Sequence, residues 1–233
     1  TLFQEPRAPQ ADPRDFTAPP PARSVDEQLL RSLAGNYVYD RSSALQLNLQ
    51  ARANGLQARL SGITGGEISE QFRDEANLAR AILREFGAGE VDLLATHMHP
   101  GIPESWPGRM EASIWPQHTA AWGRLRDVKL VFATEMRRED EPWVFVWMNL
   151  IHAEGDCLAC VAFRPQRKLQ LLYLDVNGSF CADGQVFVAR SPSEFSPNDG
   201  HLVKRIEFLE RDKLLLTNSA TSLIFRRETA TQP

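Results

Sequence analysis

The sequence contains few cysteines, no excess of basic residues and no long apolar run, and each of these shortages is informative. Three cysteines are an odd number and exclude complete disulfide pairing within the chain. The 26 lysines and arginines are outnumbered by 30 aspartates and glutamates, so the net charge of -4 provides no electrostatic footprint for nucleic acid. No apolar stretch approaches the roughly 20 residues that a membrane-spanning helix needs.

Recognisable catalytic motifs are also missing. No Ser-His-Asp set stands in the context of a nucleophile elbow. The glycines of residues 62–66 lack the lysine and the strand–helix frame of a phosphate-binding loop. No acid–base pair is apparent among the scattered carboxylates. We therefore expect a protein that is not an enzyme, and the sequence predicts no cofactor.

Short strands make up most of the chain. Residues 45–49 alternate leucine with polar side chains, and Asn54-Gly55 is typical of a hairpin turn. From residue 128 to residue 226, further short apolar segments are separated by turn residues. About twelve strands are more than one open sheet holds without curling or splitting. The pattern predicts an all-β fold, an antiparallel barrel.

Two helices interrupt this β pattern. A short N-terminal helix is predicted after Ser24, which with Glu27 forms a capping-box pattern, and Gly35 ends it. Residues 67–86 carry apolar side chains at helical spacing and charged residues on the other face, as in an amphipathic helix. Strands are expected around residues 91–99 and 110–114.

The domain organisation follows from these segments. Residues 1–23 are rich in proline and form a tail that a partner or the barrel surface would have to order. Residues 24–233 are predicted to form a single β-barrel domain, with a helical insertion at about 67–107. The strand at 143–151 is apolar on both faces, so its outer face needs a cover, either the inserted helix or a partner protein.

This layout resembles the lipocalin-like (calycin) barrels. In that family a short helix leads to a Gly-x-Trp in the first strand, and a basic residue near the chain end packs across the tryptophan. Gly35-Asn36-Tyr37 stands in the place of the Gly-x-Trp, with tyrosine for tryptophan, and Arg226 or Arg227 stands in the place of the basic residue. The resemblance implies a barrel that holds a small apolar molecule. The opening Leu-Ala-Gly-x-aromatic stretch is also similar to that of phycobilin chromophore lyases.

Aromatic side chains are the predicted ligand-binding residues, because binding pockets are mostly apolar and aromatic. Alternation places them on strand faces that could line a barrel; the five candidates are Phe132, Trp143, Phe145, Trp147 and Tyr173. The same tryptophans could equally form a core where the inserted helix docks.

Histidines and cysteines are the remaining candidates for chemistry. His97 and His99 share a face if extended and could bind a metal ion together with His118 or His152, but an ordinary polar strand end beside a loop is the favoured explanation, and no metal site is predicted.

The three cysteines, Cys157, Cys160 and Cys181, are disulfide candidates. In a regular strand only one of Cys157 and Cys160 points toward Cys181, and buried free thiols are the alternative. Redox chemistry by the Cys-x-x-Cys pair would need a helix N-terminus, which is not predicted there.

The sequence thus predicts a periplasmic or secreted binding protein that holds a small hydrophobic molecule in a β-barrel. The missing initiator Met and the proline-rich start suggest the location. Two alternatives stay open: a non-catalytic accessory subunit that contacts a protein partner through the tail or the helical insertion, and a lyase-like enzyme acting on a pigment or lipid.

Overall fold

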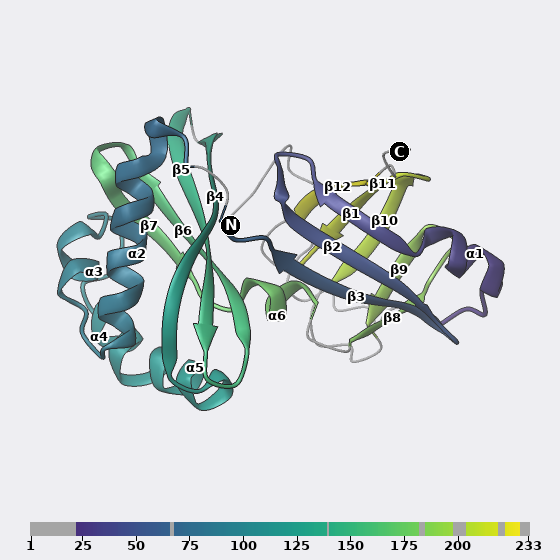
Figure 1. The fold of residues 1–233 in the computed structure, drawn as a ribbon, viewed down its shortest axis with the longest axis horizontal. Coiled ribbons are helices and arrows are strands. Elements are labelled where there is room, and N and C mark those ends of the chain that lie inside the picture. Colours follow the sequence, from purple (N-terminus) through teal and green to yellow (C-terminus); the bar gives the residue numbers. More distant parts are fainter. Residues whose placement is uncertain are drawn as a thin grey trace. The chain divides into compact units, whose positions relative to one another are not determined.

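The structure is a computed structural model that describes residues 22–65, 68–138, 140–181, 185–197, 204–218 and 222–228. The chain divides into two compact units, which Figure 1 shows with their elements labelled. We call residues 1–60 together with 177–233 the barrel unit, and residues 61–176 the sheet unit. The sequence predicted one domain over residues 24–233. The prediction differs because alternation shows that a strand is half-buried but does not identify the sheet to which it belongs.

The barrel unit contains a closed antiparallel barrel of eight strands, which confirms the predicted fold class. Around the barrel the strand order is β1-β12-β11-β10-β9-β8-β3-β2. The strands are β1 (Gly35–Tyr39), β2 (Ser42–Arg52), β3 (Gly55–Gly62), β8 (Val186–Ala189), β9 (Glu194–Pro197), β10 (Arg205–Glu210), β11 (Lys213–Thr217) and β12 (Ser222–Arg227). The short helix α1 (Glu27–Leu33) precedes β1, and α6 (Val176–Phe180) precedes β8 along the chain.

Large apolar side chains form the interior of this barrel. Alternate residues of each strand are buried, among them Tyr37, Leu47, Phe187, Phe195 and Phe225. These side chains line the interior of an eight-stranded barrel, which is just wide enough to be filled by side chains or to hold one small ligand.

Arg227 packs on the first strand and on the end of α1. Its guanidinium lies 5.4 Å from the ring centroid of Tyr37 and donates to the carbonyls of Ser32 and Ala34, each at 2.6 Å. The Tyr37 hydroxyl donates to the carbonyl of Leu33. Of the two arginines that the sequence offered for this position, Arg227 packs across the first-strand aromatic. Arg226 pairs with Asp40 instead.

The sheet unit is built on a four-stranded antiparallel sheet with the strand order β4-β5-β6-β7. Its strands are β4 (Leu125–Arg138), β5 (Glu141–His152), β6 (Asp156–Arg164) and β7 (Lys168–Tyr173). Its helical segments are the 3-10 turns Glu70–Phe72 and Pro165–Arg167, the helices α2 (Arg73–Gly87), α3 (Asp92–His97), α4 (Trp106–Arg109) and α5 (Trp115–Trp122), and the π turn Met110–Ile114.

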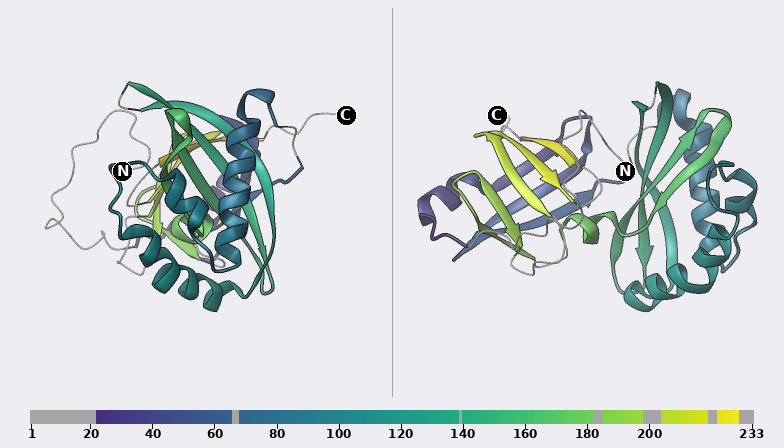
Figure 2. Two further views of the ribbon diagram at one scale, coloured as in Figure 1. Left: turned by 90° about the vertical axis from the view of Figure 1, so that its left-hand side faces the viewer. Right: turned by 180° about the vertical axis from the view of Figure 1, so that it is seen from behind.

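Helices cover one face of this sheet, as Figures 1 and 2 show. The amphipathic helix predicted at residues 67–86 is present as α2, and its buried residues include Ile82, Leu83 and Phe86. They pack in one core with Val146 and Met148 of β5. On this face, the inserted helix α2 thus provides the cover that the doubly apolar strand at residues 143–151 was expected to need.

Four local predictions were wrong. Residues 92–97 and 110–114 are helical, because short apolar segments do not distinguish the two periods. The insertion spans residues 61–176 and includes four strands, so it is larger than the predicted 67–107. The cap of α1 is Asp26, whose side chain accepts from the amide of Gln28, and not Ser24.

Among the described residues, no helix is long and apolar enough to cross a membrane. Nearly all of the proline-rich tail, residues 1–21, lies outside the described residues, so its predicted role in binding a partner stays a prediction.

Candidate metal centre

The five aromatic residues predicted to bind a ligand lie in the sheet unit and not in the barrel. Across the strands, Phe132 pairs with Trp147, Trp147 with Cys160, and Cys160 with Tyr173, so these side chains form one row on the same face of the sheet. Trp143 and Phe145 are on the same face by alternation along β5. This face is opposite to the one that α2 covers. Five side chains expected in a barrel wall therefore gather on a sheet.

Two indole N–H groups on this aromatic face lack acceptors. Nε1 of Trp143 and Nε1 of Trp147 are buried without a hydrogen-bond partner. The ring of Phe132 stacks on that of Trp147 at 5.5 Å, and Trp143 stacks on Phe145 at 6.2 Å. An unmade hydrogen bond at a buried donor is costly, so these positions need an explanation beyond packing.

Cys157 and Cys160 are free thiols, so neither forms the predicted disulfide with Cys181. Cys157 and Cys160 belong to β6 in the sheet unit and face opposite sides of the sheet, whereas Cys181 belongs to the barrel unit. Cys157 points toward the helices and Cys160 toward the aromatic face. Strand alternation predicted that Cys157 and Cys160 face opposite sides of the sheet. The sequence did not indicate that Cys181 belongs to a different compact unit.

The histidines that lie together are not the pair that the sequence singled out. His97 and His99 do not join a cluster of metal-binding groups among the described residues; His99 accepts from the amide of Gly101 through Nδ1. The two residues considered as third ligands, His118 and His152, instead lie together beside Cys157.

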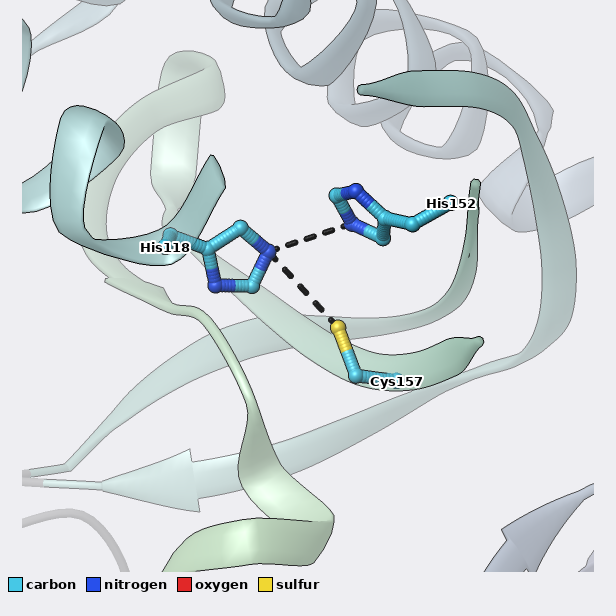
Figure 3. Close-up of side chains that lie close together, drawn as sticks. All are labelled: His118, His152 and Cys157. Atoms are coloured by element: carbon cyan, nitrogen blue, oxygen red, sulfur yellow. Dashed lines mark hydrogen bonds between the residues drawn. The ribbon is translucent and has the colours of Figure 1, made fainter. Parts of the chain in front are cut away.

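Figure 3 shows these three side chains converging from different elements. The Nε2 atoms of His118 and His152 are 3.1 Å apart, and the Cys157 sulfur lies 3.7 Å from Nε2 of His118. The three potential ligand atoms are all within 4.8 Å of one another. His118, His152 and Cys157 are 8%, 3% and 1% exposed, respectively. We call this set the His-His-Cys cluster.

The local fold explains why the three side chains meet. His152 is the last residue of β5 and Cys157 is the second residue of β6, after a short turn, and both point to the helix-covered face. His118 reaches them from α5, whose C-terminal end hydrogen-bonds to this turn: the amide of Glu154 donates to the carbonyl of Trp122, and that of Ala153 to Arg124.

Two glycines make this junction possible. Gly123 follows α5 with a φ of +74°, and its carbonyl lies 2.9 Å from Nδ1 of His152. Gly155 in the strand turn has a φ of +153°, and the ring of Trp122 lies 3.3 Å from where a Cβ would be. Both backbone conformations disfavour residues with a side chain.

The surroundings of the cluster favour uncharged groups. Burial, with help from His152, lowers the pKa of His118 to about 4. Burial also lowers the pKa of His152, although the Gly123 carbonyl opposes this. Burial and the carboxylate of Asp175 raise the pKa of the Cys157 thiol to about 12. Trp115 stacks on the His118 ring at 5.2 Å and adds an apolar wall.

These properties argue against a cysteine nucleophile and for a metal ion. A reactive thiol needs a lowered pKa and access to solvent, and Cys157 has neither. A divalent cation would stabilise the thiolate directly and accept the imidazole lone pairs. The bond from His152 Nδ1 to a backbone carbonyl is the outer contact that fixes a metal-binding histidine with Nε2 toward the ion.

A sequence signal for part of this cluster exists. His152 and Cys157 stand five positions apart across a turn that contains Gly155. His118 is 34 residues before His152, and only the packing of α5 on the sheet brings them together.

Neither a family model, a curated protein nor a solved structure matches this chain.

Proposed function

We propose that the protein binds a transition-metal ion, Zn²⁺ in the first place, through Nε2 of His118, Nε2 of His152 and the sulfur of Cys157. The observation that carries this proposal is the spacing of the three atoms. Zinc bonds of about 2.0–2.1 Å to nitrogen and 2.3 Å to sulfur give tetrahedral edges of about 3.3 Å between nitrogens and 3.6 Å between nitrogen and sulfur. The distances of 3.1 and 3.7 Å are close to these edges.

The donor types select the metal. One thiolate and two imidazoles suit Zn²⁺ or Cu⁺, whereas Mg²⁺, Ca²⁺ and Mn²⁺ prefer oxygen ligands. The carboxylates of Asp156 and Asp175 raise the pKa of Cys157 without belonging to the cluster. A hard cation therefore has little reason to bind here.

A metal ion at this position would join three elements of the sheet unit. His118 comes from α5, His152 from the end of β5 and Cys157 from the start of β6. Because the ion binds the folded arrangement and an unfolded chain does not present it, its binding free energy adds to the stability of the sheet unit.

The test uses Co²⁺ as a spectroscopic probe for Zn²⁺ in the full chain. We expect a thiolate-to-cobalt charge-transfer band and the visible bands of tetrahedral cobalt, which Zn²⁺ abolishes by displacement. Cys157→Ser should remove the charge-transfer band and lower the affinity by roughly a hundredfold or more, because a ligand bond is lost.

Cys160→Ser is the matched control, since Cys160 is buried in the same strand but faces the other side of the sheet. It should retain both the band and the affinity. Equal spectra and affinities for wild type and both variants would show that the ion binds elsewhere and would end the proposal.

The binding of a small hydrophobic molecule stays a second proposal. What supports it is the aromatic face with its two indole N–H groups that lack acceptors, Trp143 and Trp147. A molecule with an apolar body and a hydrogen-bond acceptor would suit these groups.

Native mass spectrometry of protein purified from its source tests this second proposal. A retained small molecule that Trp147→Phe loses would support it. A retained protein partner would favour the accessory-subunit alternative, and a bare monomer would count against both. The periplasmic or secreted location also stays a proposal.

A further inference from the structure

We infer that Asp175 biases the His-His-Cys cluster toward a divalent ion and away from Cu⁺. Its backbone N–H holds the sulfur of Cys157, and its carboxylate offsets the second positive charge of the ion. The inference rests on the proposed function and goes beyond it, because the ligand types alone suit both Zn²⁺ and Cu⁺. Asp175 is not a member of the cluster, so it acts on the ion through Cys157 and through its charge.

The register of the sheet brings Asp175 next to the cluster. β7 ends at Tyr173, which pairs with Cys160 of β6. Two residues further on, the chain has reached the start of β6, and the backbone N–H of Asp175 donates to the sulfur of Cys157. A hydrogen bond from a backbone N–H favours the charged form of its acceptor. Asp175 therefore provides an outer contact of the kind that fixes a metal ligand.

The backbone of Asp175 has an unusual conformation for a residue with a side chain. Its φ of +54° lies in the left-handed region, which glycine adopts most readily and aspartate and asparagine only occasionally. Glycine would donate the same backbone N–H with less strain. What aspartate adds at this position is a carboxylate beside the cluster.

The carboxylate of Asp175 acts on Cys157 more strongly than that of Asp156. After burial, it has the largest effect in raising the pKa of the Cys157 thiol, ahead of Asp156. Asp175 is half-buried, whereas Asp156 is exposed to water, which screens its charge. A carboxylate that opposes negative charge on the sulfur favours added positive charge at the same place.

The charge balance of metal binding turns this effect into selectivity. In the metal-free protein the sulfur of Cys157 carries a proton, and metal binding releases this proton to solvent. Cu⁺ replaces the proton with an equal charge, so a nearby carboxylate neither favours nor opposes the exchange. Zn²⁺ adds one positive charge to a buried cluster, where an uncompensated charge is costly. The carboxylate of Asp175 offsets this added charge and so favours Zn²⁺ alone.

The experiment measures the dissociation constants of Zn²⁺ and Cu⁺ for the full chain at neutral pH. Both come from competition with chromophoric chelators, and oxygen is excluded for Cu⁺. Asp175→Asn keeps the shape of the side chain, tolerates the left-handed conformation and removes the charge. We expect it to weaken Zn²⁺ binding about tenfold and to leave Cu⁺ binding within about threefold of the wild type. The loss of a merely structural residue would weaken both ions.

Two further variants separate charge from conformation. Asp175→Gly also removes the carboxylate but relaxes the backbone, so it should weaken Zn²⁺ binding as Asp175→Asn does. It carries the same test if Asp175→Asn does not fold. Asp156→Asn is the matched control, because it removes an exposed charge next to Cys157, and it should change neither affinity by more than about threefold.

A wild type that binds neither ion would overturn the proposed function and this inference together. A wild type that binds Cu⁺ and not Zn²⁺ would leave a metal centre but contradict the inference. If both ions bind, equal losses of Zn²⁺ and Cu⁺ affinity in Asp175→Asn, or no loss of either, would overturn the inference alone. Equal losses of Zn²⁺ affinity in Asp175→Asn and Asp156→Asn would also overturn it, because the effect would not belong to Asp175.

Discussion

At the scale of single residues, the two imidazoles of the cluster have defined proton positions in the metal-free protein. The Gly123 carbonyl only accepts hydrogen bonds, so Nδ1 of His152 carries a proton and its Nε2 bears a lone pair. Nε2 of His118 must then donate across the 3.1 Å contact. Metal binding requires His118 to move this proton to Nδ1, a tautomer change that leaves the ring neutral.

The lowered pKa of His118 makes the metal-free protein sensitive to mild acid. Between the unfolded value of 6.5 and the folded value of about 4, the unfolded chain binds the proton that the folded chain does not, so stability falls as pH falls through this window. The loss amounts to on the order of 3 kcal/mol by pH 4 and stops below it.

Urea unfolding at pH 7, 6 and 5 in the presence of a chelator measures this effect. His118→Gln should flatten the slope, whatever its effect on stability at pH 7, because other titrating groups are shared with the wild type. Equal slopes for the two proteins would contradict the prediction.

At the scale of elements, Arg227 joins the end of α1 to the barrel wall. Replacing it with glutamine removes two charge-assisted bonds to backbone carbonyls and the contact with the Tyr37 ring. We expect a loss of about 2–4 kcal/mol in the free energy of unfolding. The neighbouring Arg226→Gln is the control: its ion pair with Asp40 is on the surface, so chemical denaturation should show little change.

Gly123 connects α5 to the cluster and gives a second prediction for elements. A Cβ there would meet the side chains of Ala153 and Glu154 at 3.0 Å in a backbone conformation that disfavours it. Gly123→Ala should therefore move the carbonyl that holds His152 and weaken Zn²⁺ binding about 10- to 100-fold. Gly108→Ala, where a Cβ meets nothing within 4 Å, should leave the affinity unchanged in a competition titration.

The spacing of apolar residues predicted individual strands and helices better than it predicted how they pack together. Leu45, Leu47 and Leu49 alternate and are buried in β2 as expected, and the apolar stripe of α2 packs on a sheet. The aromatic row was found by alternation, but its sheet was not, because a period of two contains no information about neighbouring strands. His118 and His152 meet only because α5 packs on the sheet, and no spacing in the sequence predicts this contact.

At the scale of the whole molecule, the chain consists of two compact units. A metal ion bound within the sheet unit would therefore stabilise that unit and not the barrel unit. The His-His-Cys cluster lies entirely within residues 61–176. Zn²⁺ at a hundred times its dissociation constant should add about 2.7 kcal/mol to the sheet unit. Calorimetry of the full chain should show one transition that moves upward with Zn²⁺ and one that does not. Equal shifts of both would indicate a single cooperative unit.

The insertion of the sheet unit between β3 and β8 also has a consequence for biosynthesis. These strands are neighbours in the barrel, with Leu56 opposite Phe187, but residues 63–185 separate them along the chain. At about 5–20 residues per second, a ribosome needs roughly 10 s to translate that interval. For this time β1–β3 emerge with an unpaired strand edge, and the nascent chain must be kept from aggregating until its last strands arrive.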